Sequence, residues 1–492
     1  MTRLHQCRSS PSKLSRSGKR TSKSRICLRK LAQSTGNLEL RRNYVPRSQD
    51  ETSALIEPQL KSQKESWLAL ALFSALLCSQ CCVWNTWGPI AGFALQAFPN
   101  WNESLVALLS DWGCISYLTC CVPCCWLLYK KESRFKQNTH DFYLLIYTKI
   151  EMSVLIKGLA MSLRMAAILS TMATFVRCVF HEENIFTITA HTAAILNGLS
   201  GVILGISSAC NQLGMAISYL IGPAVVGNTA VYNTTFSTRN ASSSESAAFD
   251  KAYSRALRVQ IMSLMRIGVL CFLPKEPCQS LVPSEISERL GLVESVVRLL
   301  KNRNMWRLCS AAALSQGVTG PWLAMMTMTF DASITQEEAD KLAFWTIILS
   351  GVLSLTASRL ADAFQRHLKV ALYILLATSS AMFLWILLLD DRVLVFHKGE
   401  LYAAVILGIS ASWSTPALFL ELASEIAFPV SEAIVGGYMI FLSNLVGALF
   451  YFSYFLPWMN EHWSTYWTFA NLAMATILVI YVKEDYTRTK IE

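Results

Sequence analysis

Long apolar segments are the feature that most restricts how this chain can fold. Residues 67–102, for example, contain no charged side chain. A helix of about twenty apolar residues spans the roughly 30 Å hydrocarbon core of a bilayer. Only 15% of the 492 residues are charged and 53% are apolar, whereas soluble domains carry about 25% charged residues. The sequence therefore predicts an all-α polytopic membrane protein, with spans near 67–90, 104–128, 158–180, 186–226, 256–273, 307–330, 341–358, 369–389, 400–421, 433–456 and 463–482.

A polar central segment divides these spans into two groups. It covers 274–306 and predicts a cytosolic loop between an N-terminal bundle at 66–273 and a C-terminal bundle at 307–482. Two bundles joined in this way are typical of secondary transporters built from repeats. Because Lys and Arg gather in cytosolic loops, both ends of the chain are expected in the cytosol, including the tail 483–492. The basic segments are the N-terminal tail, 129–158, 274–306 and 358–369.

Three N-x-S/T sequons agree with this orientation. Asn102, Asn233 and Asn240 all fall in loops expected on the non-cytosolic side, where glycosylation occurs. The segment 186–226 leaves one question open, because it is too long for one span. If the segment is one span, every later loop changes sides and Asn233 faces the cytosol. If it is two spans, almost no residues remain for the turn between them; Asn211 and Gln212 could mark that turn.

The N-terminal segment 1–65 carries the whole net charge of the chain. It holds fifteen Lys or Arg against five Asp or Glu, and the remaining residues balance. Its polar, Ser-rich composition predicts a disordered cytosolic tail that could rest on anionic lipid; a transit peptide is the alternative. Near its end, Glu51, Leu55 and Ile56 form the acidic dileucine pattern that clathrin adaptors read as an address to endosomes and lysosomes. We therefore expect a lysosomal membrane protein, with the plasma membrane as the alternative.

The cysteines cluster in the apolar segments, above all in "CCVPCC" from Cys120 to Cys125. Thiolates suit zinc or copper, but this block has no neighbouring histidine. Ordinary apolar cysteines are the simpler interpretation, with palmitoylation near the cytosolic end as a further option. The chain also lacks a nucleophile elbow, an H-E-x-x-H motif and a phosphate loop. We expect no enzyme, no catalytic residue, no metal, no cofactor and no nucleic-acid partner.

The motif "VWNTWGPI" in the first span combines two tryptophans, an amide and a Gly-Pro pair. Trp84 and Trp87 are three residues apart and share a helix face. Pro89 after Gly88 is expected to kink the helix. Indole faces bind cations and stack on rings, and the Asn85 amide needs a partner when it is buried. The motif predicts a wall for a ring or a quaternary amine; tryptophans marking the membrane interface are the alternative.

The same motif resembles the disrupted-in-renal-carcinoma branch of the feline-leukaemia-virus-receptor-like transporters, solute carrier family 49 of the major facilitator superfamily. "ELASEIAFPVSEAIVGGYMIFLSNLVG", "AFWTIILSGV" and "SRLADAF" resemble that group as well, and the resemblance covers most of 66–485. It implies twelve helices in two six-helix halves with the solute site between them. The chain departs from the family in a segment of about 28 residues, 130–157, and in the short junction between helices four and five.

Polar groups inside spans are candidates for function by default. Trp84, Asn85 and Trp87 are expected to bind solute, and the superfamily resemblance implies the same for Gln316 and Trp322. Asp111 in the second span is a candidate for proton coupling. A group near the cytosolic end is expected to couple or gate transport, with a salt-bridge cluster as the simpler interpretation; its members are Glu421, Glu425, Glu432, Asp362 and Arg366.

The combined prediction is a secondary carrier for a small organic solute. The resemblance implies solutes such as a pyridoxine-like B6 vitamin, a choline-like cation or a haem-type metabolite, and it implies proton coupling. The expected partners are the solute, protons, a clathrin adaptor and membrane lipid. A receptor-like or regulatory isoform that does not transport is the alternative, which the short junction between helices four and five favours.

Overall fold

The computed structural model describes residues 71, 74–98, 100–136, 165–177, 183–204, 209–226, 292–330, 334–363, 367–430, 432–456 and 463–484. The chain divides into two units, Met1–Lys64 and Glu65–Glu492, and every described residue belongs to the second. The sorting signal, the segment 137–164, Asn233, Asn240, the predicted span 256–273 and Arg366 lie outside the described residues.

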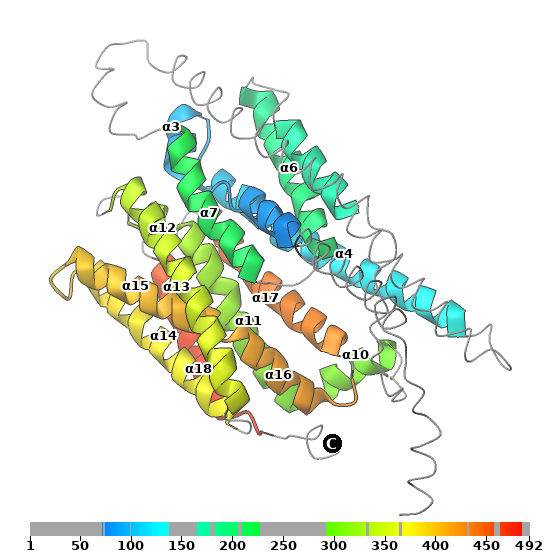
Figure 1. Ribbon diagram of the computed structural model, residues 1–492. Coiled ribbons are helices and arrows are strands. Elements are labelled where there is room, and N and C mark those ends of the chain that lie inside the picture. Colours follow the sequence, from blue (N-terminus) through cyan, green and yellow to red (C-terminus); the bar gives the residue numbers. More distant parts are fainter. Residues whose placement is uncertain are drawn as a thin grey trace, which may run out of the picture. The chain divides into compact units, whose positions relative to one another are not determined.

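The described part of the first half contains helices only. A first helix covers 74–84 and turns through 85–90 into α3 (Ala91–Ala97). The other helices are α4 (Glu103–Lys136), Met165–Arg177, α6 (Glu183–Leu204) and α7 (Ala209–Val226). Figure 1 shows α4 and α6 side by side, and the two helices are in contact.

The described part of the second half is also helical. Here α14 lies between α15 and α18, with which it is in contact (Figure 1). The helices are α10 (Leu292–Lys301), α11 (Arg303–Ala324), α12 (Met326–Thr329), α13 (Gln336–Ala363), α14 (Leu368–Asp390), α15 (Lys398–Trp413), α16 (Pro416–Ala427), α17 (Glu432–Ser453) and α18 (Trp463–Ile480).

Five segments of the described chain are long and apolar enough to cross a membrane. Their outer surfaces are apolar too: α14 buries Leu372 and Phe383 but exposes Val370 and Ile374. A helix that is apolar on all sides belongs in a membrane or a large core. The five segments are Glu103–Cys121, Gln336–Arg359, Leu368–Asp390, Lys398–Ala427 and Ile434–Ser453.

The structure answers the question about 186–226, because this segment forms two helices. The first ends at Leu204 and the second begins at Ala209. Asn211 and Gln212 therefore lie in the first turn of α7 and do not form the junction. Two helices keep the predicted orientation of every later span.

Several helices begin or end at other residues than the predicted spans and loops. The predicted span 400–421 is two helices, because Pro416 lacks a backbone N–H and begins α16 as a new helix. The predicted loop 274–306 contains α10. It also contains the start of α11, where Asn302 Oδ1 accepts hydrogen bonds from the backbone N–H of Asn304 (3.0 Å) and Met305 (3.3 Å). Helix α4 continues to Lys136, past the predicted end at 128.

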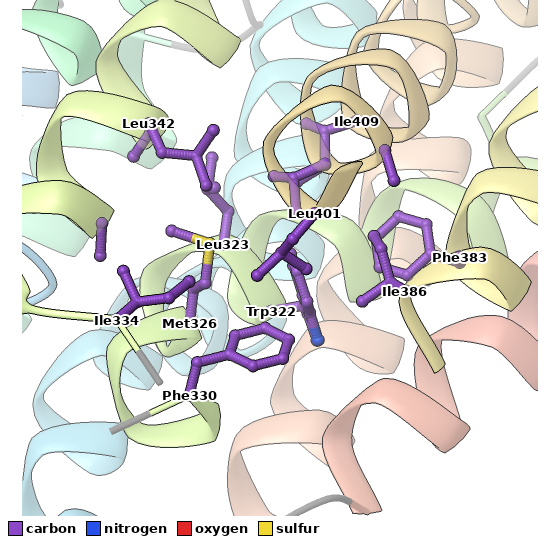
Figure 2. Close-up of a cluster of buried hydrophobic side chains, with 14 of the residues drawn as sticks. Trp322, Leu323, Met326, Phe330, Ile334, Leu342, Phe383, Ile386, Leu401 and Ile409 are labelled. Atoms are coloured by element: carbon purple, nitrogen blue, oxygen red, sulfur yellow. The ribbon is translucent and has the colours of Figure 1, made fainter. Parts of the chain in front are cut away.

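The largest buried cluster lies in the second half and reaches the first (Figure 2). Trp322 of α11 and Phe330, directly after α12, pack with Phe383 of α14 and Leu401 of α15. Tyr219 of α7, in the first half, belongs to the same cluster. Contacts between α7 and α13 and between α4 and α17 join the two halves. These two helix pairs border the region in which the candidate site residues lie.

Candidate functional site

Each half contributes one broken helix to the site, and the two breaks lie against each other. The first helix unwinds at 85–90, as Gly88 and Pro89 predicted, and resumes as α3. Helix α11 contains Pro321, ends at Ala324 and resumes as α12. A Cβ atom on Gly88 would lie 3.1 Å from the Ala324 carbonyl oxygen and 3.4 Å from the Tyr219 hydroxyl. Glycine is therefore needed here for close approach of the two breaks, and broken helices of this kind form solute sites in transporters.

Side chains near these breaks link the two halves. Gln336 Nε2 of α13 donates a hydrogen bond to the Pro89 carbonyl (3.2 Å) and another to Asp340 Oδ1 (3.0 Å). The Tyr219 hydroxyl donates to the Leu323 carbonyl (3.4 Å). In the predicted orientation these contacts lie toward the non-cytosolic side, so the structure has the halves joined there.

Asp111 is the most unusual polar residue of the site. It lies within α4 and is 0% exposed, and among the described residues only the weakly polar Cys114 thiol, one turn further along α4, is a hydrogen-bond partner for its carboxylate. It interacts electrostatically with Cys114 and with Tyr451 of α17. A Cβ atom on Gly447 of α17 would lie 3.4 Å from Cys114 Sγ. Asp111 therefore lies where the two halves meet.

The chemistry available to Asp111 is narrow. An ionised carboxylate without partners in an apolar interior is strongly disfavoured. The group is stable there as the neutral acid or beside a cation. It can therefore hold a proton or pair with a positively charged solute, which are the two chemistries that a coupled carrier requires.

Trp84 and Asn85 face neighbours within the first half. The Trp84 ring lies between α4 and α6, because a Cβ atom on Gly113 would lie 1.8 Å from it and one on Gly201 would lie 2.9 Å from it. The Asn85 amide Nδ2 donates to the Ser218 hydroxyl of α7 (2.9 Å). The amide thus has the partner helix that burial requires, and the Trp84 ring is half-buried.

Trp87 has a different environment from Trp84. Its ring centroid lies 5.4 Å from that of Trp101, in a cluster with Phe98 and Phe186. The Arg177 guanidinium carbon lies 5.6 Å from the centre of the Trp87 ring. Arg177 is buried, and its Nε and Nη1 have no hydrogen-bond partner among the described residues. The arginine therefore rests on an aromatic face.

The two candidates on α11 also differ. Gln316 Nε2 is buried without a hydrogen-bond partner in the described chain. Trp322 lies in the core of the second half (Figure 2), where its ring centroid is 4.9 Å from that of Phe383. Its Nε1 donates to the Thr465 hydroxyl (3.3 Å), so its polar atom is already paired.

The structure places part of the proposed gating group. Glu421 and Glu432 are exposed and Glu425 is half-buried. Asp362 lies on α13 and its side chain is outside the description. Lys369, at the start of α14, donates from Nζ to the carbonyls of Ile480 (2.8 Å), the last residue of α18, and Val482 (2.7 Å), which follows it.

Sequence reasoning missed several residues of this site. Gln336 and Asp340 carried a weak signal, because they are polar groups at the start of an apolar helix. Tyr219, Gly113 and Tyr451 carried none, because their importance depends on contacts between helices that are far apart in the sequence. Asn102 is exposed, and its Oδ1 accepts a hydrogen bond from the Leu105 backbone N–H (2.9 Å) at the start of α4.

Comparison with solved structures decides the fold. The D-xylose-proton symporter superimposes with a TM-score of 0.52 at 13% identity, covering 87% of this chain and 99% of that one. The chain has the major facilitator fold. The nucleoside transporter NupG gives the same TM-score at 11% identity, covering 84% of this chain and 98% of that one. The two-half arrangement implied by the sequence motifs is therefore confirmed at the level of the fold.

Curated relatives agree with the resemblance seen in the motifs. "Solute carrier family 49 member 4 homolog" of Xenopus laevis is 27% identical over 451 residues, covering 86% of this chain and 92% of the relative. Its counterpart in Xenopus tropicalis is 26% identical over 450 residues with the same coverage. No protein-family model matches the chain. The chain thus has the major facilitator fold, contains several segments long and apolar enough to cross a membrane, and is similar to proteins of solute carrier family 49.

Proposed function

We propose that this major facilitator protein is a proton-coupled carrier of a small organic solute in the lysosomal membrane. The observation that carries the proposal is Asp111 of α4, a fully buried carboxyl that has no charged partner among the described residues and only the Cys114 thiol as a hydrogen-bond partner there, and that interacts with Tyr451 of α17. A carrier coupled to protons needs a titratable group within the membrane, and such a group is best placed where the two halves meet, since that region opens to each side in turn. Asp111 occupies that position.

The solute class follows from the groups near the breaks. Trp84 is half-buried between α4 and α6, so part of its ring is accessible, and Gln316 Nε2 has no hydrogen-bond partner among the described residues. These groups suit a small polar ring of the pyridoxine type and, nearly as well, a choline-like cation. A haem-type metabolite is the third candidate that the family resemblance supplies. The separate helices α6 and α7 support an ordinary twelve-helix carrier over a receptor-like isoform.

Solute binding can be tested through thermal stability. Ligand that binds only the folded state stabilises it, by about 2.7 kcal/mol at a hundred times its Kd. We expect pyridoxine or choline to raise the Tm of the purified protein and Trp84→Ala to remove that shift. Trp345 is 61% exposed, so Trp345→Ala is the matched control and keeps the shift. If no solute stabilises the wild type, or both variants respond alike, the proposed site is wrong.

The lysosomal part of the proposal rests on the dileucine pattern and the sequons. Replacing Leu55 and Ile56 by Ala should move the protein from lysosomes to the cell surface, because adaptors would no longer read the signal. Endoglycosidase treatment of Asn102→Gln, Asn233→Gln and Asn240→Gln variants checks the lumenal loops in the same cells. Unchanged lysosomal location of the double-alanine variant would dismiss the signal.

A further inference from the structure

Helix α10, in the segment between the two halves, has three distinct faces. Ser295 and Leu299 are 1% and 2% exposed, and this face packs on the bundle. The helix contacts α11 and α17. A second face exposes four large apolar side chains at positions i, i+3, i+4 and i+7, the spacing of one helical stripe. These are Val293, Val296, Val297 and Leu300, with exposed fractions of 70%, 37%, 41% and 46%.

The third face is polar and mostly basic. Arg298 and Lys301 are exposed beside Glu294, and Arg303 and Arg307 follow at the start of α11. The segment 292–307 thus carries four basic residues and one acidic residue. An apolar stripe next to a basic face is the pattern of a helix that lies in a membrane interface.

The chain itself fixes where α10 must lie. Only Asn302 separates its last residue, Lys301, from the first residue of α11, the helix that contains most of the predicted span 307–330. Trp306 reinforces this arrangement, because its Nε1 donates to the Leu300 carbonyl (2.8 Å) at the end of α10. Tryptophan is itself enriched at membrane interfaces. The exposed valines therefore lie at the level where the bilayer surface begins.

We propose that α10 binds anionic phospholipid of the cytosolic leaflet. The stripe of Val293, Val296, Val297 and Leu300 enters the boundary between headgroups and acyl chains. Arg298 and Lys301 pair with the phosphate or carboxylate of the headgroups. Charge complementarity favours lipid over a protein partner, because Arg298 and Lys301 border the apolar stripe in the last turn of α10 and Arg303 and Arg307 follow at the start of α11. The inference concerns the helix before the second half and does not depend on which solute is carried.

Hydrogen exchange of the full chain in nanodiscs tests this proposal. We expect the amides of 292–301 to exchange more slowly in discs with phosphatidylserine than in discs of pure phosphatidylcholine. The double variant R298Q/K301Q should lower the affinity of α10 for phosphatidylserine over phosphatidylcholine by about 25-fold, because each basic residue contributes roughly fivefold. The difference in exchange between the two discs should fall accordingly. Glutamine keeps helix propensity, so the variant retains α10 in both discs.

A matched variant in the same helix gives the opposite prediction. Glu294→Gln removes the acidic group from the basic face and should enlarge the difference between the two discs. Val293→Ser with Val297→Ser should speed exchange in both, because the apolar stripe is weakened. Equal exchange in the two discs, or equal protection in detergent without lipid, would overturn the proposal and indicate that protein covers this face.

Discussion

Asp111→Asn is expected to abolish proton-driven accumulation of solute while leaving solute exchange intact. Asparagine has nearly the shape of aspartic acid but cannot release or take up a proton. Because Asp111 is fully buried and an uncompensated charge is disfavoured there, the neutral acid is the form that the fold accommodates. Asparagine is neutral too, so the substitution should not weaken the fold. Uptake under a pH gradient and counterflow without one measure the two activities in proteoliposomes.

The control for Asp111→Asn is Asp391→Asn. Asp391 lies in the second half, directly after α14. It is exposed and accepts a hydrogen bond from the Tyr466 hydroxyl of α18. This variant should keep both accumulation and exchange. Full accumulation by Asp111→Asn would show that the proton is carried elsewhere. Loss of exchange as well as accumulation would indicate that Asp111 binds the solute itself.

Gly214→Ala is expected to lower the stability of the protein strongly. Among the described glycines, only Gly113, which meets the Trp84 ring, would bring an added Cβ atom closer to a neighbour. A Cβ atom on Gly214 of α7 would lie 2.1 Å from the Cys78 carbonyl oxygen in the first helix. Backbone cannot rotate away as a side chain can, so the two helices would have to separate. Overpacking of this kind costs about 1–3 kcal/mol or more. Thermal unfolding in detergent should show a clear fall in Tm.

Gly437→Ala provides the comparison for Gly214→Ala. Gly437 lies in α17, and a Cβ atom there would meet nothing within 4 Å. Alanine in a helix is favoured over glycine by about 1 kcal/mol, so this variant should keep or raise the Tm. Similar Tm values for the two variants would contradict the close packing of α7 against the first helix.

The sequence predicted the helical fold well because membrane spans depend on local composition. It also located the break in the first helix, because Gly88 and Pro89 disfavour a continuous helix wherever they stand in the fold. Helix ends were harder to predict, because single residues set them. Pro416 begins α16 because it lacks a backbone N–H, and Asn302 begins α11 by accepting two backbone hydrogen bonds. A window that averages hydropathy does not resolve such positions.

Side-chain roles were predicted less well for a physical reason. In a membrane helix both faces are apolar, so hydrophobic periodicity does not separate inside from outside. Trp322 is fully buried and Trp345 is exposed, although both stand in similar apolar sequence. Asp111 could be singled out because charge is costly anywhere in a membrane. Tyr219 and Gln336 depend on partners more than one hundred residues away.

Uptake of labelled pyridoxine into proteoliposomes of the wild-type chain, with and without a pH gradient, tests the central claim most directly. The account predicts accumulation above the outside concentration that needs the gradient and collapses when a protonophore is added. Choline and a haem-type metabolite are tested in the same vesicles. Uptake no greater than in protein-free vesicles for all three solutes, from protein that unfolds cooperatively on heating, would contradict the account.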